Sequence, residues 1–380
     1  MNCDRGSKTQ EFAPSPPFRN YDATTKEIMP SKSPLVIQTL AINNSKFILQ
    51  SENIYHICEN MKDRFKCIVI VGRARTGKSY LLNVLRRKLL NIKDEALLGF
   101  KSQSGSQGVT EGLWSMDCST SNEDFSYMLC DTEGTYEIMK DQLVSSKLFA
   151  ISAMISSCLI VNIKNKIDKD ELNFLKIFFR NTHCNSKKKF PHLVFLVRDW
   201  ENPQEFCFGI QGGNKYLQAI SDGNEELERI TNMFERVECF LMPSIGTENA
   251  ESPRYNQEYN NVRDVFDEKC NDFIKKIVFK VEKVYDTFLF QESFKKIVET
   301  INKKEHIDIL DLEEANNENS KLRNLQMKYV MGAAFGGAVA GAVGSLCTGG
   351  VAVKTATSVI SNSAPRVISA LLAASKAKFF

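Results

Sequence analysis

Over most of the chain, two kinds of hydrophobic pattern alternate: short continuous apolar runs and longer runs with helical spacing. From Pro34 to about Val278, short runs of Val, Ile, Leu and Phe are followed by longer runs whose apolar residues recur at helical spacing. Continuous apolar runs are typical of strands buried on both faces, and their alternation with helical runs is typical of a parallel sheet covered by helices. The pattern therefore predicts an α/β fold with a mainly parallel sheet.

The predicted elements lie at definite places in this pattern. Strands are expected at 65–71, 113–118, 125–130, 157–163, 192–197 and 238–242, and helices at 79–90, 142–154, 170–181 and about 271–304. The strands LWSMDC and FSYMLC flank the turn-rich stretch STSNED, so we expect them to pair as antiparallel neighbours.

Both ends of the chain differ from the globular unit expected at 34–283. Residues 1–33 are polar with four prolines and are expected to form a disordered tail. Residues 284–328 are expected to form a short helical middle segment. The 25 residues of 329–353 carry no charge, and as a helix they would span ~37 Å, enough to cross a bilayer core. Residues 354–380 suit an amphipathic tail at a membrane surface.

The apolar segment is rich in glycine, which leaves its form open. Seven glycines, some at G-x-x-x-G spacing, are compatible with a single span, a shallow hairpin or a packed glycine-rich helix. Basic residues flank it on both sides, which favours a hairpin with cytosolic ends.

Charge and cysteine content narrow the class of protein. The chain has 49 basic and 46 acidic side chains, a net charge of +3, which does not favour a nucleic-acid partner. Its 11 cysteines include no C-x-x-C pair, and Cys67, Cys130, Cys158 and Cys239 lie within apolar runs. Such cysteines are expected to be buried free thiols in a reducing, cytosolic environment.

The stretch GRARTGKS at 72–79 carries the first candidate chemistry. It matches G-x-x-x-x-G-K-S and lies between a predicted strand and a predicted helix. Gly72 and Gly77 let the backbone approach phosphate oxygens, while the helix N-terminus offers unpaired N–H groups. Lys78 would neutralise phosphate charge and Ser79 would bind Mg²⁺. The stretch therefore predicts a phosphate-binding loop.

Two further residues fit the metal part of this chemistry. Asp131 follows the apolar strand YMLC, as a carboxylate facing Mg²⁺ would. Thr110, in SQGVTEG, is a candidate switch threonine whose hydroxyl closes on Mg²⁺ when a γ-phosphate is present. A stretch of this composition is more often only a loop, so the assignment of Thr110 depends on its place between the two motifs.

Three stretches offer a carboxylate for selecting guanine. NKID at 165–168 has the letters N-K-x-D, and Arg-Asp pairs occur at 198–199 and 263–264. NKID follows the first strand after DTEG, whereas small-GTPase folds carry the base motif on the strand after that one. Arg198 and Asp199 end that second strand, so we favour Asp199 as the guanine reader. NKID is then a chance match and 263–264 a surface pair.

Arg75 is the unusual residue of the phosphate-binding loop. A loop arginine usually points to solvent, but one at this position could also act as an arginine finger on the γ-phosphoryl oxygens. The loop sequence alone leaves both interpretations open.

Taken together, the motifs resemble the dynamin-related GTPases of the guanylate-binding protein and atlastin group. The likeness rests on GRARTGKSYLLN, GVTEGLW, DTEG, FAISAMISSCLIVNI and LVFLVRDWENPQEFCFGIQGGNKYL, the last being close to atlastins, and it covers about 34–283. The resemblance implies that Arg198 and Asp199 replace N-K-x-D and that Arg75 is catalytic. It also implies that Thr110 and Glu133 order the attacking water.

The same resemblance implies ligands and partners. GTP and Mg²⁺ are the expected ligands, with further nucleotide contacts at Thr76, Tyr80 and Gly134 and a guanine cap at 243–249. A GTP-dependent homodimer through the GTPase faces is expected, as is an anchor in the endoplasmic reticulum membrane with the GTPase domain facing the cytosol.

Two hypotheses about the whole chain stay open. One is a GTPase that tethers, shapes or fuses endoplasmic reticulum membranes. The other is a nucleotide-gated binding module, or a soluble guanylate-binding-like protein, without fusion activity. The first is the leading hypothesis, because of the four ordered motifs and the charge-free segment. The stretch before the apolar segment is too short for the family's three-helix middle domain, which favours the nucleotide-gated module over true fusion.

Overall fold

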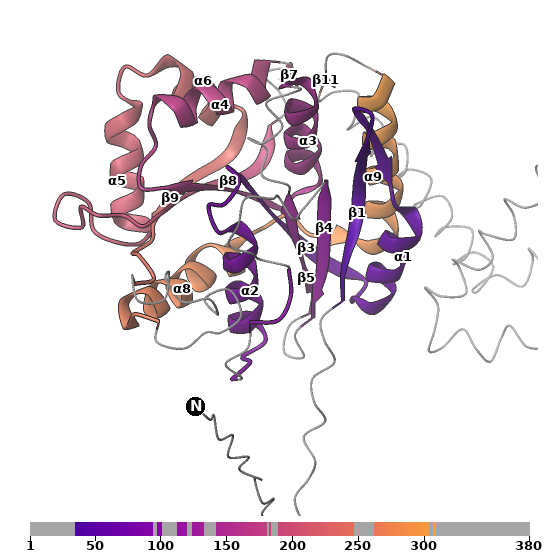
Figure 1. The fold of residues 1–380 in the computed structure, drawn as a ribbon, viewed down its shortest axis with the longest axis horizontal. Helices are drawn as coiled ribbons and strands as arrows, with labels where there is room; N and C mark the ends of the chain where they lie inside the picture. Colours follow the sequence, from indigo (N-terminus) through magenta and orange to yellow (C-terminus); the bar gives the residue numbers. More distant parts are fainter. Residues whose placement is uncertain are drawn as a thin grey trace, which may run out of the picture.

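The fold is a mixed β-sheet covered by helices on both faces (Figure 1). The computed structural model describes residues 35–93, 97–100, 112–119, 124–132, 142–180, 182–183, 189–246, 262–303 and 307–308. Within these residues the α/β class expected from the sequence is confirmed.

The elements occupy the following residues. The strands are β1 (Val36–Asn43), β2 (Lys46–Leu49), β3 (Arg64–Gly72), β4 (Leu113–Cys118), β5 (Ser126–Thr132), β6 (Cys158–Lys164), β7 (Thr182–His183), β8 (Phe190–Arg198), β9 (Phe234–Leu241), β10 (Tyr285–Asp286) and β11 (Ile307–Asp308). The helices are α1 (Ser51–Asn60), α2 (Lys78–Leu89), α3 (Gln142–Ile155), α4 (Lys169–Arg180), α5 (Ile210–Ser221), α6 (Glu225–Asn232), α8 (Asp264–Lys276), a 3₁₀ turn (Val278–Lys280) and α9 (Thr287–Lys303). Every strand and helix predicted above is present, with shifted ends and one exception described below.

The strand order of the main sheet is β2-β1-β4-β5-β3-β6-β8-β9, with β10 paired to β3. The block β5-β3-β6-β8-β9 is parallel, as predicted. The other half is antiparallel, because β4 returns directly into β5 and the β1–β2 hairpin adds to β4. The expected antiparallel pairing of 113–118 with 125–130 is thus confirmed, and the sheet is more mixed than the apolar runs indicated.

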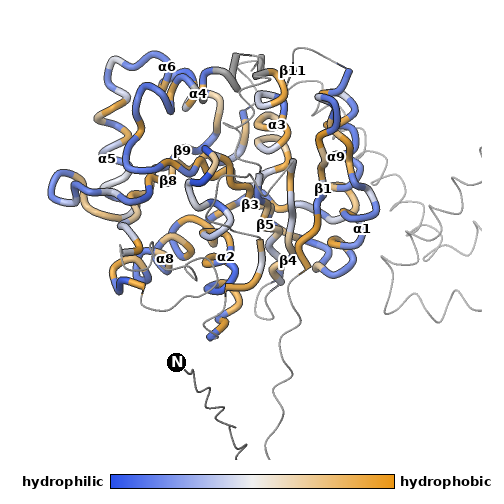
Figure 2. The backbone as a smooth tube through the Cα atoms, viewed as in Figure 1, coloured by the Kyte–Doolittle hydropathy of each residue, from blue (hydrophilic) through white to orange (hydrophobic). Residues whose placement is uncertain are grey.

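The continuous apolarity of β3 has a simple origin in this arrangement. Val69 and Val71 face a cluster that includes side chains of α1, α3 and α9, whereas Ile68 and Ile70 face a second cluster formed with α2 and α8. Both faces of the strand are therefore buried from residue 67 to residue 71, and all five side chains there are apolar. Figure 2 shows the hydrophobic colour concentrated along the central strands.

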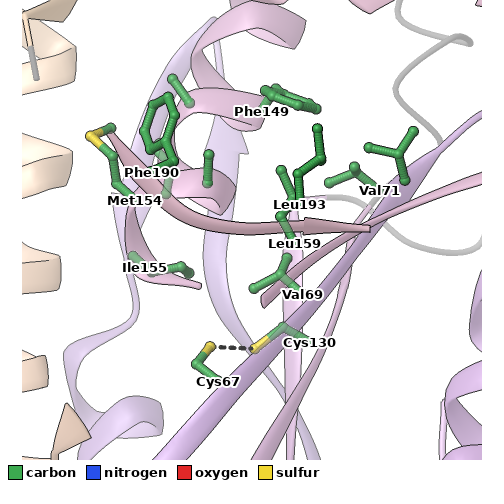
Figure 3. Close-up of a cluster of buried hydrophobic side chains, with 14 of the residues drawn as sticks. Cys67, Val69, Val71, Cys130, Phe149, Met154, Ile155, Leu159, Phe190 and Leu193 are labelled. Atoms are coloured by element: carbon green, nitrogen blue, oxygen red, sulfur yellow. Dashed lines mark hydrogen bonds between the residues drawn. The ribbon is translucent and has the colours of Figure 1, made fainter. Parts of the chain in front are cut away.

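Buried thiols lie within this core. Cys67, Cys130, Cys158 and Cys239 are all fully buried and unoxidised, as the sequence predicts. Cys67 and Cys130, on the neighbouring strands β3 and β5, have their Sγ atoms 3.7 Å apart (Figure 3). Burial raises the pKa of the Cys67 thiol well above its ordinary value, so this thiol stays protonated and acts as a small apolar side chain.

The prediction of one helix over 271–304 is wrong in one respect, because the helix is interrupted between α8 and α9. Phe273 and Ile277 pack on the α2 side of the sheet, whereas Phe290 and Phe294 pack on the α1 side. The chain must therefore pass from one face to the other, and on the way β10 pairs with the start of β3. A continuous helix would have left one of the two apolar faces in water.

Several predicted regions lie outside the described residues. These are the tail at 1–33, residues 304–306 and 309–328 of the middle segment 284–328, the apolar segment 329–353 and the tail 354–380. In the part of the chain that is described, no helix is long and apolar enough to span a bilayer. The boundaries proposed for these regions stay predictions.

Candidate functional site

The turn between β3 and α2 needs its two glycines. Gly72 has φ +144°, and a Cβ there would lie 2.4 Å from the backbone oxygen of Asn162 on β6. Gly77 has φ +79° and directly precedes α2, and a Cβ there would meet the guanidinium of Arg198 at 2.6 Å. Side chains at either position would push the turn away from the strands beside it.

Inside the turn, the carbonyl oxygen of Arg73 accepts two hydrogen bonds. Thr76 Oγ1 donates to it at 2.8 Å and Lys78 Nζ at 2.9 Å. Lys78 is buried, with 6% of its surface exposed, so its ammonium lies within the curve of the backbone. A buried cation beside a helix N-terminus is suited to receive an anion such as a phosphate.

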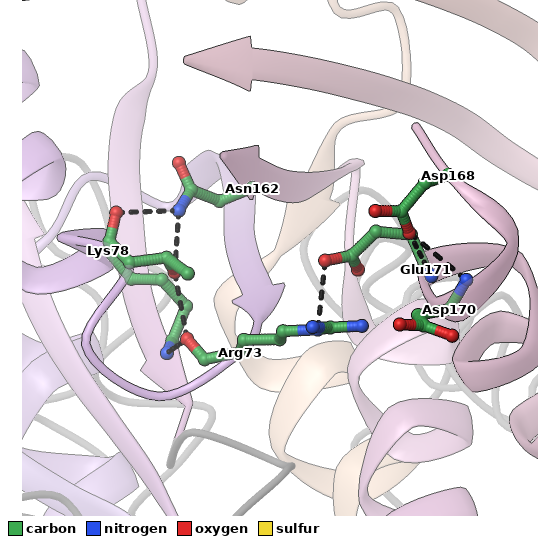
Figure 4. A network of polar contacts seen from close by, with 7 residues as sticks. Arg73, Lys78, Asn162, Asp168, Asp170 and Glu171 are labelled. Carbon is green, nitrogen blue, oxygen red and sulfur yellow. Dashed lines mark hydrogen bonds and ion pairs between the residues drawn. The ribbon is translucent and has the colours of Figure 1, made fainter. Parts of the chain in front are cut away.

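Two neighbouring strands hold the turn from the side. Asn162 on β6 donates to the carbonyl and to the hydroxyl of Thr76, at 3.0 and 2.8 Å. Arg198 on β8 donates to the carbonyls of Thr76 and Gly77, at 3.3 and 3.1 Å. Because β3, β6 and β8 are parallel, their carboxyl ends meet at one edge, which is where ligands bind in such sheets. Figure 4 shows Asn162 and Lys78 at the turn.

A hydroxyl and a carboxylate meet at the other side of the turn. Ser79 Oγ donates to Asp131 Oδ2 at 2.5 Å, and Asp131 is 1% exposed. The second oxygen of Asp131, Oδ1, is buried without a hydrogen-bond partner. Burial raises the pKa of Asp131 to about 6, against the opposing influence of Lys78 and of the Ser79 hydrogen bond. A buried carboxylate oxygen with no partner needs a cation or a donor to satisfy it.

This pair of residues fits Mg²⁺. Hydroxyl and carboxylate oxygens are the ligands that Mg²⁺ prefers, and it commonly takes few of them from the protein and the rest from phosphates and water. Among the described residues no group of three His, Cys, Asp or Glu side chains could hold a metal. Ser79 and Asp131 would therefore hold the ion together with oxygens of a bound phosphate.

Arg75 and Tyr80 occupy contrasting positions. Arg75 is exposed near the apex of the turn in the left-handed region, with φ +61°. Such backbone strain is concentrated at functional sites. Tyr80, by contrast, has a buried side chain within the core beneath α2. A ligand contact at Tyr80 would have to come from its backbone N–H.

The Arg-Asp pair at the end of β8 lies at the same edge as the turn. Asp199 has φ +55° and is partly exposed, directly after Arg198. The N–H of Asn165 donates to the carbonyl of Arg198 at 2.7 Å, so the end of β8 is tied to the chain that follows β6. The structure thus brings Arg198 to the turn and leaves Asp199 beside it at the edge.

Asp168 of the NKID stretch caps a helix. The Oδ1 atom of Asp168 accepts the backbone N–H groups of Asp170 and Glu171, both at 3.0 Å, and so caps the start of α4. Its carboxylate is thereby engaged in helix capping, as a short acidic side chain before a helix usually is. The other Arg-Asp pair, Arg263 and Asp264, is exposed at the start of α8.

Some of the expected site lies outside the described residues. This applies to Thr110, Glu133 and Gly134 and to 247–249 of the expected guanine cap. Conversely, the structure adds Asn162, Arg73 and Glu171, which were not expected from the sequence. Asn162 had a signal, because it is the one amide in the apolar strand CLIVNI and stands near its carboxyl end. Glu171 had none, since a glutamate in a first helical turn is ordinary.

Comparison with known proteins agrees with this geometry. Residues 44–286 match the family model described as guanylate-binding protein, N-terminal domain. The chain is 29% identical over 277 residues to Atlastin-1 of Bos taurus, covering 65% of this chain and 50% of that protein. It is 29% identical over 271 residues to Atlastin of Drosophila melanogaster, covering 63% and 50%, and 28% over 281 residues to Atlastin-3 of Homo sapiens, covering 65% and 52%. The chain thus spans about half the length of these relatives.

Proposed function

Because this chain belongs to the guanylate-binding protein family, we propose that it binds GTP with Mg²⁺ and hydrolyses it. Members of the family and the atlastins are GTPases. The observation that carries the proposal is the Ser79–Asp131 contact beside Lys78, with the Oδ1 atom of Asp131 left without a partner. A purely structural serine–aspartate pair would not require a buried, unpaired carboxylate oxygen.

Each part of the turn has a role in this proposal. The backbone N–H groups at the start of α2 receive phosphate oxygens, and the Lys78 ammonium turns from the Arg73 carbonyl toward the β- and γ-phosphates. Ser79 and Asp131 would hold Mg²⁺, which would neutralise charge that develops on the phosphates. Arg75, exposed near the apex, stabilises charge on the γ-phosphoryl oxygens, and Thr110 and Glu133 order the attacking water.

Guanine is selected by Asp199 in this proposal. Its carboxylate would accept two hydrogen bonds from the base, which adenine cannot supply. Support comes from the position of Asp199 at the ligand edge and from the capping role of Asp168, which is the competing carboxylate. Arg198, by bonding to the carbonyls of Thr76 and Gly77, links the base side of the site to its phosphate side.

Steady-state turnover of the full chain tests the enzymatic proposal. Arg75→Ala is expected to lower kcat for GTP by about 10³-fold, since an arginine finger is typically worth that much, with GTP affinity largely retained. Arg229→Ala, an exposed arginine on α6, is the matched control and keeps the parent kcat. If the Arg75 variant hydrolyses GTP as fast as the parent, the finger assignment is wrong. If the parent binds no GTP, the function itself is refuted.

The base assignment has its own test. Asp199→Asn is expected to weaken GTP binding by about 1–3 kcal/mol, or roughly fivefold to 150-fold, and to leave the weak binding of ATP unchanged. Asp168→Asn is the control for the NKID stretch and is expected to leave nucleotide preference unchanged. A loss of GTP preference in the Asp168 variant instead would reassign the guanine reader.

We further propose that GTP binding pairs two copies through their GTPase faces and that the cycle tethers, shapes or fuses endoplasmic reticulum membranes. The support is the similarity to atlastins and the charge-free segment 329–353. Liposomes carrying the full chain would show lipid mixing that depends on GTP turnover if the protein fuses membranes. Clustering that persists with a non-hydrolysable analogue would indicate tethering alone. Absence of the chain from membranes after a carbonate wash would indicate a soluble protein of the family.

A further inference from the structure

Arg73 is held through both its backbone carbonyl and its side chain. Its carbonyl oxygen receives Lys78 Nζ and Thr76 Oγ1. Its side chain runs away from the turn toward α4, where Nε lies 2.9 Å from Glu171 Oε1 (Figure 4). The two groups carry opposite charges, so the contact is an ion pair.

The acceptor in this ion pair is fixed in place. Glu171 lies in the first turn of α4, and its backbone N–H donates to the capping carboxylate of Asp168. Only 9% of its side-chain surface is exposed, against 34% for Arg73. A mostly buried carboxylate is costly unless a cation accompanies it, so Glu171 and Arg73 are expected to stay together.

The ion pair completes a set of anchors around Arg75. Beyond Arg75, the turn is fastened by Asn162 at Thr76 and by Arg198 at Thr76 and Gly77. Before Arg75, the side-chain anchor is Arg73 on Glu171. Arg75 thus sits in its strained backbone conformation between anchored neighbours, which is the situation in which strain can persist.

We propose that Arg73 and Glu171 are a positioning pair that sets where the turn carries Arg75, and hence the rate at which bound GTP is cleaved. The inference rests on the proposed GTPase function. Neither side chain needs to touch the nucleotide, because the pair acts through the backbone on either side of Ala74. Losing the pair leaves the phosphate-binding amides, Lys78 and the Ser79–Asp131 contact in place, so it lowers kcat more than it weakens nucleotide binding.

A double-mutant cycle on the full chain tests this inference. Glu171→Gln and Arg73→Gln are each expected to lower kcat about tenfold to a hundredfold, since displacement of a catalytic group by about 1 Å has effects of this size. GTP affinity, measured with a fluorescent analogue, is expected to change less than about threefold. The double variant is expected to be no slower than the slower single variant, because both changes remove one interaction.

Two more variants separate positioning from a general loss of structure. Glu171→Asp keeps the charge and should recover part of the lost kcat. Glu226→Gln removes the ion pair between Glu226 of α6 and Lys176 of α4, so it perturbs the same helix without reaching the turn, and it should keep the parent kcat. Should Glu171→Gln fail to fold, Arg73→Gln carries the test, because Arg73 is the more exposed partner.

The outcomes are distinct. Unchanged kcat in the Glu171 and Arg73 variants overturns the inference and leaves the proposed function intact. A proportional fall in kcat, affinity and thermal stability, or additive losses in the double variant, shows a merely structural pair and also overturns it. A parent that binds and hydrolyses no GTP refutes the proposed function, and the inference with it.

Discussion

Substituting Gly72 tests how closely the phosphate-binding turn packs against the neighbouring strand β6. In Gly72→Ala, the new Cβ would stand 2.4 Å from the backbone oxygen of Asn162, a buried atom of β6 that cannot rotate away. The φ of +144° adds about 1–3 kcal/mol of backbone strain for a residue with a side chain. Overpacking against the strand adds about 1–3 kcal/mol more. The expected loss in the free energy of unfolding is therefore about 2–6 kcal/mol.

Gly223→Ala is the matched control for this prediction. Gly223, between α5 and α6, also has a positive φ, +72°, but a Cβ there would meet nothing within 4 Å. It should lose only the strain contribution, about 1–2 kcal/mol. The entropy that alanine removes from the unfolded chain is common to both variants and cancels in the comparison. The difference between them therefore reports the contact with Asn162, expected at about 2 kcal/mol, together with the difference in backbone strain between φ +144° and φ +72°.

Urea unfolding followed by far-ultraviolet circular dichroism and by tryptophan fluorescence gives both values. GTP affinity provides a second measurement, because separating β3 from β6 would move the turn in the Gly72 variant only. Equal stability of the two variants, within about 0.5 kcal/mol, would refute the claim that backbone contact excludes a side chain at Gly72.

Three further predictions concern two residues near the site, Gly77 and Asp168, and one acidic residue of β4, Asp117. In Gly77→Ala, the new Cβ would lie 2.6 Å from the movable guanidinium of Arg198 and should displace that side chain. The main expected effect is weaker GTP binding, with a smaller effect on the melting temperature. An unchanged affinity in a titration would contradict this prediction. Asp168→Ala removes the cap of α4 and should cost about 1 kcal/mol in urea unfolding, and a loss near zero would count against the capping role. Burial raises the pKa of Asp117 to about 6, against a lowering influence from its hydrogen bond with Ser119, so the folded state disfavours the charged carboxylate. The contribution of Asp117 to the free energy of unfolding is therefore fully present below pH 4, where the carboxyl group is protonated. It is lost as pH rises through 6, by at most about 3 kcal/mol. Asp117→Asn should therefore match the parent near pH 4 and exceed it at pH 7, and a difference that does not vary with pH would disprove the assignment.

Much of the candidate site could be predicted because its residues follow one another closely in the chain. The strand FKCIVIV, the turn and the helix SYLLNVL form one continuous pattern, so β3, the turn and α2 were all expected. The same pattern could not show that the side chain of Tyr80 lies in the core. That outcome depends on the rotation of α2 on the sheet, which the packing of α8 and neighbouring strands decides.

The parts that were not predicted involve partners far apart in sequence. Asn162 lies 86 residues from Thr76, and Arg198 lies 121 residues from Gly77. These contacts follow from the order β3-β6-β8, which no local period encodes. The interruption between α8 and α9 could not be predicted from local sequence either. The two segments together have the spacing of a single helix, and only the packing on opposite faces of the sheet separates them.

By itself, the sequence determined where strands and helices form and which residues carry phosphate and metal chemistry, since apolar period and motif spacing act over a few residues. Only the tertiary structure decided that Arg73 pairs with Glu171 and that an Asp131 oxygen is left without a partner. The physical reason is that burial, pairing and desolvation depend on the neighbours that the fold supplies, and neighbours across a sheet are not neighbours along the chain.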